Sequence, residues 1–326
     1  MKALVYEGVE KLRFRDAPDP VPAPGEHLIK VEATGICGSD MHAFLGHDAR
    51  RPAPLILGHE AAGVIVGGPR DGERVTINPL VHCGTCSACA AGRENLCPSR
   101  QIISMPPREG AFGQYVAMRD TNLVSVPDGF AIAKAALAEP LAVSWHAARM
   151  GLEALTPKIG SNVLILGGGP IGLGSALALR AMGLDDITIV EPNPVRRSYL
   201  IDHCGENAVD SVDGLYALVV DAVGYAATRA RASALARPGG VIVHVGLGED
   251  TGGLDVRRVT LQEITFIGTY TYTSDDFRQT AEAMYRGELG ALDWFQPRAL
   301  QDGADAFADL RNGTVSAPKI VLDPWA

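Results

Sequence analysis

The sequence predicts an α/β protein in which a β-rich unit is followed by a unit built on a doubly wound parallel sheet. At 326 residues, of which 47% are hydrophobic, the chain is long for a single core, and two domains are the better expectation. Up to about residue 140, short alternating or β-branched runs lie between Pro/Gly-rich turns, which is typical of strands. Beyond that point, continuous apolar runs alternate with helical segments, and this pattern favours parallel strands covered on both faces.

The expected elements follow from these runs. In the first unit the expected strands are 2–6 (KALVY), 11–16 (KLRFRD), 27–36 (HLIKVEATGI), 61–67 (AAGVIVG), 73–77 (ERVTI) and 113–118 (GQYVAM). In the second unit, helices are expected at 142–155, 172–184 and 227–238, and strands at 162–167, 186–191, 217–224, 240–246 and 263–270. The tail holds a helix at 275–289 and a strand at 319–323 without an evident partner, so we expect it to pack back on the first unit.

Charge and hydropathy exclude several classes of protein. The formal net charge is −9 and the sequence pI is about 5.4, with no basic stripe to neutralise phosphates, which argues against nucleic acid as a partner. No apolar stretch is long enough for a membrane span, and the N-terminal segment MKALVYEGVEKLRF has no secretory pattern. We therefore expect a cytoplasmic protein with reduced thiols.

Four of the six cysteines lie close together, at 83, 86, 89 and 97, with the spacing C-x2-C-x2-C-x7-C. A disulfide cluster would be expected in a small secreted chain, which this is not. Four unrelated buried thiols are the other alternative, but buried cysteines normally scatter along a sequence. A closed tetrahedral zinc site formed by Cys83, Cys86, Cys89 and Cys97 fits best, and such a site holds a loop together without performing chemistry.

The segment VLILGGGPIGLG predicts a dinucleotide site. Gly167, Gly169 and Gly172 follow an apolar strand and open a helix, which is the context that gives a G-x-G-x-x-G pattern its meaning. The glycines would permit a tight turn, the approach of a pyrophosphate to the helix N-terminus, and close helix–strand packing. Glu191 ends the next strand, where a carboxylate accepts the adenosine ribose hydroxyls and repels a 2′-phosphate. The alternative is an ordinary helix-opening turn.

A third group of residues offers metal ligands: a thiolate at Cys37, an imidazole at His59, and carboxylates at Glu60 and Glu139. Taken singly, each residue is more simply a buried thiol, a hydrogen-bonded histidine or a surface charge. Together they fit a catalytic zinc with few protein ligands and an open position. Their spacing in the sequence does not establish that they converge.

The ordered motifs GICGSDMH, LGHEAAG, CGTCSACAAGRENLC, EPLAVSWHA and GGGPIGLG closely resemble those of the zinc-dependent medium-chain alcohol and polyol dehydrogenases, over essentially the whole chain. The resemblance implies a GroES-like catalytic domain, formed by residues 1–141 and 270–326, that is interrupted by a Rossmann NAD-binding domain at 142–269. It implies two zinc ions per chain. NAD is the expected cofactor, although Arg196 and Arg197 in the turn after Glu191 are of the kind that can accept the 2′-phosphate of NADP.

The resemblance also implies roles for single residues. Cys37 and His59 would bind the catalytic zinc, and Glu60 would be a ligand or a carboxylate that exchanges with bound water. Asp40 would orient His59. Glu139 stands where alcohol-preferring members of the family carry cysteine, and a glutamate there is typical of the polyol and threonine branch.

Ser39 would take the proton of the substrate hydroxyl, and His42 would relay it towards solvent. The residues that the motifs place at the cofactor are Gly167, Gly169, Pro170, Ile171, Gly172, Glu191, Arg196 and Val245. The expected reaction is hydride transfer to NAD from a secondary alcohol of a small polyol or sugar alcohol, which yields a ketone. Threonine or a butanediol is the alternative substrate, and a zinc-independent reductase or a non-catalytic protein on the same scaffold is the alternative class.

Two further expectations concern the surface. The apolar strand near EITFIGTYTYT would lie at the edge of the parallel sheet and pair with a second copy, which predicts a homotetramer or homodimer. The loop LGHDARRPAPLI lies between two metal motifs, where His47, Arg50 and Arg51 are either solvated loop charges or contacts to oxygen atoms of the substrate.

Overall fold

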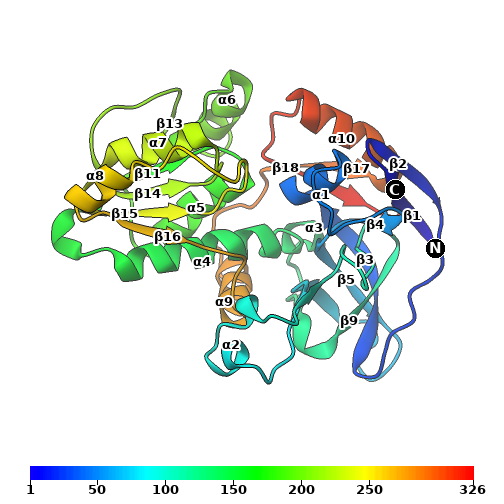
Figure 1. The fold of residues 1–326 in the computed structure, drawn as a ribbon. Coiled ribbons are helices and arrows are strands. Elements are labelled where there is room, and N and C mark those ends of the chain that lie inside the picture. Colours follow the sequence, from blue (N-terminus) through cyan, green and yellow to red (C-terminus); the bar gives the residue numbers. More distant parts are fainter.

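The computed structural model describes residues 1–326 and contains two lobes, each built around its own β-sheet (Figure 1). No helix in it has both the length and the apolar character that crossing a membrane requires. The fold class that the sequence predicts is confirmed, because a mixed-sheet lobe is joined to a lobe with a purely parallel sheet. The domain boundaries at 141/142 and 269/270 stay predictions.

The first lobe is organised by a 7-stranded sheet of order β10-β6-β5-β3-β18-β17, in which β9 also pairs with β3. A 3-stranded sheet of order β2-β1-β4 and the β7–β8 pair complete it. The strands are β1 (Lys2–Gly8), β2 (Lys11–Asp16), β3 (Glu26–Gly35), β4 (Leu55–Ile56), β5 (Glu60–Val66), β6 (Arg74–Ile77), β7 (Leu80–Val81), β8 (Gln101–Ile102), β9 (Tyr115–Arg119), β10 (Leu123–Ser125), β17 (Phe295–Ala299) and β18 (Lys319–Asp323). The helices associated with it are α1 (Gly38–Phe44), α2 (Ser87–Ala90), α3 (Ile132–Ala135) and α10 (Gly303–Asn312), whereas α4 (Ala138–Ala154) packs mainly on the second lobe and α9 (Ser274–Tyr285) packs on α4.

The second lobe holds a 6-stranded parallel sheet of order β13-β12-β11-β14-β15-β16. Its strands are β11 (Val163–Leu166), β12 (Ile187–Val190), β13 (Ala208–Val209), β14 (Tyr216–Asp221), β15 (Ala236–His244) and β16 (Thr265–Gly268), and its helices are α5 (Pro170–Ala181), α6 (Pro194–Asp202), α7 (Ala226–Leu235) and α8 (Val256–Leu261). The strand order reverses between β11 and β14. In such sheets a ligand binds outside the carboxyl ends of the strands at that point.

Both faces of the parallel sheet are buried, as the continuous apolar runs predict. Along β11, Val163 and Ile165 belong to a cluster shared with α4 and α5, whereas Leu164 and Leu166 belong to a second cluster shared with α7. Successive side chains of a strand point to opposite faces, so a strand covered on both faces is apolar throughout.

All four expected helices have shifted bounds in the structure, and two of the shifts involve prolines. The helix expected from residue 142 begins at Ala138, because Pro140 is tolerated within the first helical turn. The helix expected over 227–238 ends at Leu235. Pro238 is disfavoured within a helix and lies in strand β15 instead. Helix α1 carries no strong periodic signal and was not expected from the sequence.

The tail returns to the first lobe, as expected from its lack of a partner. Strand β18 pairs in parallel with β17 and antiparallel with β3, where Val321 faces Gly35. In Figure 1 the red C-terminal strands lie beside strands from the first part of the chain. This return places a late segment of the chain next to α1, where the candidate site begins.

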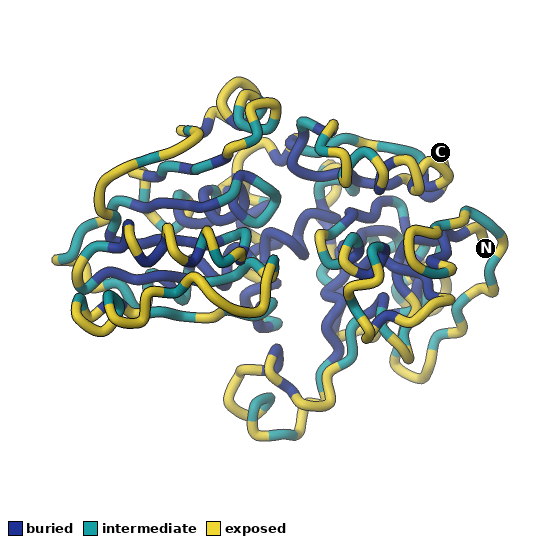
Figure 2. The backbone as a smooth tube through the Cα atoms, turned by 45° about the horizontal axis from the view of Figure 1, so that its top comes forward, coloured by how far each residue is buried: buried dark blue, intermediate teal, exposed yellow.

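Burial is concentrated in the two sheets and in α4, whereas the segment around α2 projects into solvent (Figure 2). Between residues 82 and 93 no residue is buried. A segment of this kind has no hydrophobic core to hold its shape, so another type of cross-link is required there.

Candidate functional site

The candidate metal centre lies where β3, α1 and β5 meet. Cys37 directly precedes α1, and His59 directly precedes β5; antiparallel pairing of Gly35 with Glu60 brings the two segments together. The ligand atoms of Cys37, His59 and Glu60 all lie within 4.8 Å of one another. A Cβ atom on Gly35 would lie 2.1 Å from Glu60 Oε2, so this close approach depends on glycine.

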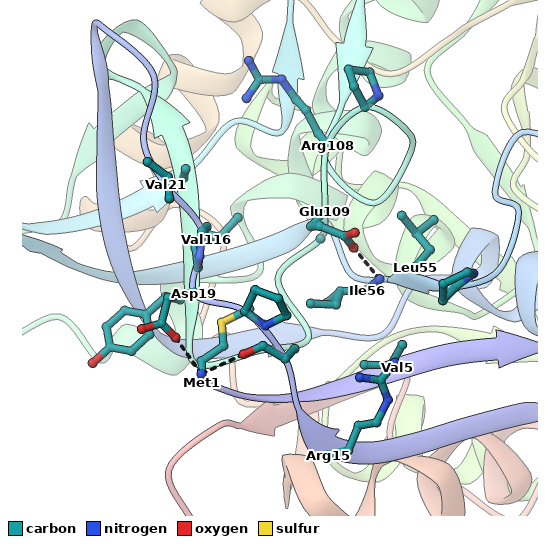
Figure 3. Close-up of a pocket in the computed structure, with 18 of the residues that line it drawn as sticks. Met1, Val5, Arg15, Asp19, Val21, Leu55, Ile56, Arg108, Glu109 and Val116 are labelled. Carbon is teal, nitrogen blue, oxygen red and sulfur yellow. Dashed lines mark hydrogen bonds and ion pairs between the residues drawn. The ribbon is translucent and has the colours of Figure 1, made fainter.

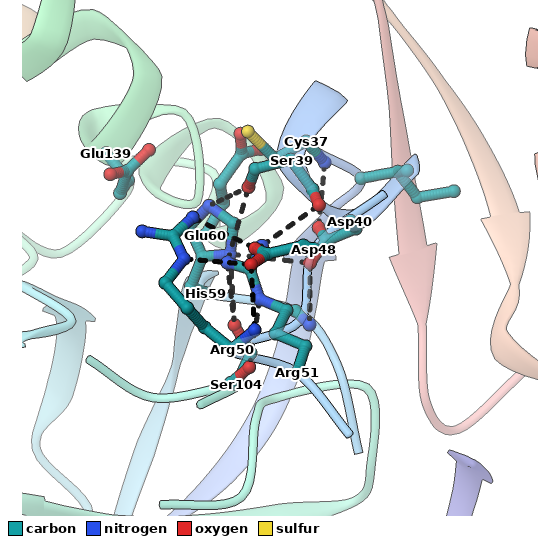
Figure 4. Close-up of polar contacts among 12 residues, drawn as sticks. Cys37, Ser39, Asp40, Asp48, Arg50, Arg51, His59, Glu60, Ser104 and Glu139 are labelled. Carbon is teal, nitrogen blue, oxygen red and sulfur yellow. Dashed lines mark hydrogen bonds and ion pairs between the residues drawn. The ribbon is translucent and has the colours of Figure 1, made fainter. Parts of the chain in front are cut away.

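Asp40 fixes the orientation of the His59 ring (Figure 4). Its Oδ1 lies 3.5 Å from His59 Nδ1, and it also accepts hydrogen bonds from the backbone N–H groups of Cys37 (3.0 Å) and Gly58 (3.2 Å). Burial would raise the pKa of Asp40, but the neighbouring His59 ring and these hydrogen bonds hold it below its usual value. With Nδ1 facing a carboxylate, Nε2 is left for a metal ion, and the orienting role of Asp40 stays a prediction with which this geometry agrees.

Glu60 has one satisfied and one unsatisfied oxygen. Its Oε1 accepts a 2.7 Å hydrogen bond from Lys319 Nζ, which also donates to the carbonyl of Ile36 at 3.0 Å. Its Oε2 is buried and has no hydrogen-bond partner. A buried carboxylate oxygen without a partner is costly, and here it faces a thiol and an imidazole. This donor set fits zinc.

Lys319 was missed in the sequence analysis. It is 2% exposed and opens β18, and its pKa is raised above the ordinary value because Glu60 and Cys37 outweigh the effect of burial. A single lysine at the start of an otherwise apolar strand was the only signal in the sequence, and it did not identify the partner.

Glu139 lies outside the cluster formed by the other three candidate ligands. It is 6% exposed, and its Oε1 accepts a 2.8 Å hydrogen bond from the Tyr272 hydroxyl. Burial, together with the negative charge of Glu60, raises the pKa of Glu139 to about 7. Glu139 as a direct zinc ligand therefore stays a prediction, and Tyr272 is a contact that the sequence did not reveal.

A cleft of about 370 Å³ joins the candidate metal centre to the parallel sheet. On one side it is lined by Cys37, Ser39, His59, Glu60 and Glu139, and on the other by Gly169, Pro170, Ile171 and Val245. The Ser39 hydroxyl lies 3.5 Å from His59 Nε2. The predicted metal ligands, the predicted proton acceptor and the predicted nicotinamide-side residues therefore face one space.

Other predicted residues lie apart from this cleft or at its rim. His42 is exposed on α1 and does not line the cleft. His47 is exposed, and the exposed Arg50 makes a two-pronged ion pair with Asp48 at 2.8 and 2.9 Å. Arg51 is buried instead.

The glycine-rich turn has the geometry that its motif predicts. Gly167 has a φ of 97°, in the left-handed region, and a Cβ there would lie 2.4 Å from Val223 Cγ2. A Cβ on Gly172 would lie 1.8 Å from the Gly167 carbonyl oxygen, so any residue with a side chain at position 172 would prevent helix α5 from packing against the turn. Gly169 faces open space, which leaves room for a pyrophosphate at the start of α5.

A second cavity, of about 660 Å³, adjoins the same turn and is lined by Gly167, Glu191 and Arg196 among others. The Glu191 carboxylate is fixed by the backbone N–H groups of Gly168 (3.0 Å) and Asn193 (2.8 Å). Arg196 Nη1 lies 3.4 Å from Glu191 Oε2, and Arg196 Nε is buried without a partner. The two cavities flank the turn in the way that an extended dinucleotide would require.

The four clustered cysteines lie in α2 (Cys89) and on either side of it, and all are free thiols whose sulfur atoms lie within 4.8 Å of one another. The Cys86 and Cys89 sulfurs are 3.5 Å apart, and the Thr85 backbone N–H donates to Cys83 Sγ. Four convergent thiols in a segment without a core fit a closed zinc site.

Another cavity, of about 450 Å³, lies beside the N-terminus (Figure 3). The amino group of Met1 donates to the carbonyl of Ala17 and to Asp19, and Glu109 accepts from the backbone N–H of Ile56. These groups are already paired with one another, and none of the candidate metal ligands reaches this cavity.

Comparisons with known proteins agree with this geometry. The model of the alcohol dehydrogenase GroES-like domain matches residues 23–128, and the model of the zinc-binding dehydrogenase family matches residues 170–286. The chain is 35% identical to the sorbitol dehydrogenase of Bacillus subtilis over 84% of this chain and 83% of that protein. It is 32% identical to the L-galactonate-5-dehydrogenase of Escherichia coli K12 over 89% of each chain.

Among solved structures, the chain resembles one described as a short chain alcohol dehydrogenase from Escherichia coli CFT073 in complex with NADH. The TM-score is 0.88 at 25% identity, and the match covers 99% of each chain. The likeness therefore extends over both lobes.

Proposed function

The chain belongs to the family of zinc-dependent medium-chain alcohol and polyol dehydrogenases, and we propose that it oxidises a secondary hydroxyl of a small polyol or sugar alcohol to a ketone with reduction of NAD. The observation that carries the proposal is the single cleft in which the Cys37, His59 and Glu60 cluster faces the nicotinamide side of the glycine-rich turn.

The residues of the cleft have different roles in the proposed reaction. Zinc bound by the cluster would act as a Lewis acid that lowers the pKa of the substrate hydroxyl. Ser39 accepts the proton of that hydroxyl and gives up its own hydroxyl proton towards solvent, so that the serine stays neutral; its hydroxyl lies in the cleft beside His59. Ile171 and Val245 line the opposite wall, where they would hold the nicotinamide of a bound cofactor.

Glu139 supports a polyol rather than a simple alcohol. It is a buried carboxylate on the wall of the cleft with one oxygen engaged by Tyr272, so the other oxygen is available to accept a hydrogen bond from a hydroxyl next to the reacting carbon. The likeness to a sorbitol dehydrogenase supports the same substrate class.

The proposed cofactor form is NAD, on account of Glu191, and the proposed metal content is two zinc ions per chain. One ion would be held by the Cys37 cluster and the other by Cys83, Cys86, Cys89 and Cys97. The two sets together use every convergent group of potential ligands in the structure.

A screen of NAD reduction tests the proposal. It should include polyols, sugar phosphates, aldonates, diols, threonine and primary alcohols, with kcat/KM determined for each active compound. We expect a polyol or sugar alcohol to give the highest value. A clear preference for ethanol-like primary alcohols would contradict the substrate class.

A further inference from the structure

A single buried guanidinium lies behind the proton-accepting side of the cleft. Arg51 is 3% exposed, although it comes from a loop in which the neighbouring Arg50 is solvated. Its Nη1 donates to the Ser39 carbonyl at 3.0 Å and to Asp48 Oδ2 at 3.0 Å, and its Nη2 lies 3.4 Å from Ser39 Oγ. The start of α1 is thus tied to this loop through Arg51.

The Nε and Nη2 side of the Arg51 guanidinium contacts Ser104, which has a strained backbone. Arg51 Nε donates to the Ser104 carbonyl at 3.0 Å, and Nη2 lies 3.5 Å from Ser104 Oγ. Ser104 is fully buried and has a φ of 70°, in the left-handed region that serine rarely adopts. Such a conformation persists only where the surroundings hold it in place, and strained residues of this kind cluster at functional sites.

The hydroxyl groups of Ser39 and Ser104 lie next to different ring nitrogens of His59. Ser39 Oγ lies 3.5 Å from Nε2, and Ser104 Oγ lies 3.4 Å from Nδ1. One guanidinium therefore contacts the carbonyl and the hydroxyl of both serines that flank the candidate zinc-binding imidazole (Figure 4).

We propose that Arg51 is a positioning residue for the proton transfer: it fixes the backbone and hydroxyl of Ser39 so that the hydroxyl faces the substrate. This inference rests on the proposed function, in which Ser39 takes the substrate proton. The planar fork of arginine makes these contacts in a fixed geometry, whereas lysine offers a single ammonium and cannot span Ser39, Ser104 and Asp48 together.

A double-mutant cycle tests this role. In wild-type protein, Arg51→Lys is expected to lower kcat about 10- to 100-fold, since a small misplacement of a reacting group has effects of this size. In a Ser39→Ala background, the same substitution is expected to lower kcat less than about twofold, because the group it positions is already gone.

Other measurements separate positioning from general damage. The solvent deuterium isotope effect on kcat is expected to rise in Arg51→Lys, because proton transfer becomes slower. Zinc content and NADH affinity, the latter from fluorescence, are expected to match the wild type. Arg180→Lys is the matched control. Arg180 lies on helix α5, away from the cleft, and makes two 2.8 Å hydrogen bonds to the buried Glu206. Its replacement should leave kcat unchanged.

Equal losses of kcat from Arg51→Lys in both backgrounds, or no loss in the wild type, would overturn the proposal. If Arg51→Lys does not fold, Asp48→Asn releases one contact of the guanidinium and must show the same non-additivity with Ser39→Ala. A wild-type protein that reduces NAD with no compound would instead refute the proposed function on which this inference depends.

Discussion

Two buried charges, on Glu60 and Lys319, satisfy each other within the candidate metal centre. The Lys319 side chain is 2% exposed and that of Glu60 is 0% exposed, and their polar atoms are 2.7 Å apart. Such a pair is weak evidence for net stability, but removal of one partner leaves the other charge buried and alone. The pair also leaves Glu60 Oε2 free for a metal ion.

Replacement of Lys319 by methionine is therefore expected to lower the free energy of unfolding by about 3 kcal/mol, within the range typical of a broken buried pair. Urea unfolding of the zinc-replete protein measures this change. Lys2→Met is the control, because Lys2 pairs with Asp16 at the surface and should contribute about 0.5 kcal/mol or less. Equal stability of the two variants would show that Glu60 does not depend on Lys319.

Glu191 is expected to determine the cofactor preference. Wild-type protein should have a higher kcat/KM for NAD than for NADP, since the carboxylate repels a 2′-phosphate. In Glu191→Ala that preference should narrow by about tenfold or more, which corresponds to about 1.4 kcal/mol of like-charge repulsion. Arg196, 3.4 Å from the carboxylate, would then be free to meet the phosphate. A wild-type preference for NADP would show that the arginines outweigh Glu191.

Residues within a local motif could be predicted, and residues that meet through the fold could not. Gly167 and Gly172 have the conformation and contacts expected, because their roles depend on a turn only a few residues long. Lys319 is separated from Glu60 by 259 residues, and Tyr272 from Glu139 by 133 residues. No periodicity in a single sequence specifies such pairs, since they are set by how segments far apart in the chain pack together; Glu60 and Lys319, for example, lie on strands of one sheet.

At the scale of elements, helices α4 and α9 are joined by a buried polar clasp. Asp276 at the start of α9 accepts bonds from His146 Nδ1 at 2.7 Å, Arg149 Nε at 2.7 Å and the Thr273 hydroxyl at 2.7 Å. Burial would raise the pKa of Asp276, but the bonds from His146 and Arg149 hold it well below its usual value. Because α4 also packs on α5 and β15, the clasp holds α9 against the parallel-sheet lobe.

Asp276→Asn should therefore destabilise the protein in a pH-dependent way. The folded-state pKa is below the unfolded value, so the contribution of Asp276 is complete above about pH 4 and is lost as the pH falls further. At pH 7 the variant should be less stable by about 2–4 kcal/mol. Unfolding by urea at pH 7, 5 and 3.5 should show the difference from wild type shrinking only at the lowest pH. A difference that stays constant throughout would contradict the assigned charge.

The segment around α2 is expected to depend on its metal. Cys86→Ser should lose one zinc ion per chain in elemental analysis and should lower Tm, because a structural zinc contributes folding free energy directly. Cys204→Ser is the control: the Cys204 thiol lies outside both clusters, and burial raises its pKa to about 12, so its loss should leave the metal content unchanged. Retention of two zinc ions in Cys86→Ser would refute the closed site.

Loss of the zinc site around α2 should also disturb the wall of the cleft. Asn95 Nδ2 donates to the Tyr270 carbonyl at 2.8 Å, and the Arg100 guanidinium lies 4.9 Å from the Tyr270 ring centroid. Tyr270 lines the cleft. The cysteine-bearing segment thus supports part of the wall of the cleft through its own side chains.

For the whole molecule, β16 forms one of the two unpaired edges of the parallel sheet, and β13 forms the other. Strand β16 pairs with β15 on one side only, in the position predicted for the late apolar strand, and Phe266 and Ile267 are only partly buried. An edge of this kind is a template for pairing with a second chain.

We expect a homodimer or homotetramer, with a mass by light scattering of two or four times 34.4 kDa at micromolar concentration. Thr265→Lys adds a charge to the exposed start of β16 and should shift the protein towards the monomer. A monomeric wild type would rule out assembly through this edge.

The return of β18 to the first lobe also sets an order of assembly during synthesis. At about 5–20 residues per second, the 259 residues between Glu60 and Lys319 take about 13–52 s to translate. Over that interval the entire parallel sheet leaves the ribosome, while Glu60 has no ammonium partner. The dinucleotide-binding lobe is therefore complete in sequence before the candidate metal centre, which gains Lys319 only after the end of the chain has returned to the first lobe.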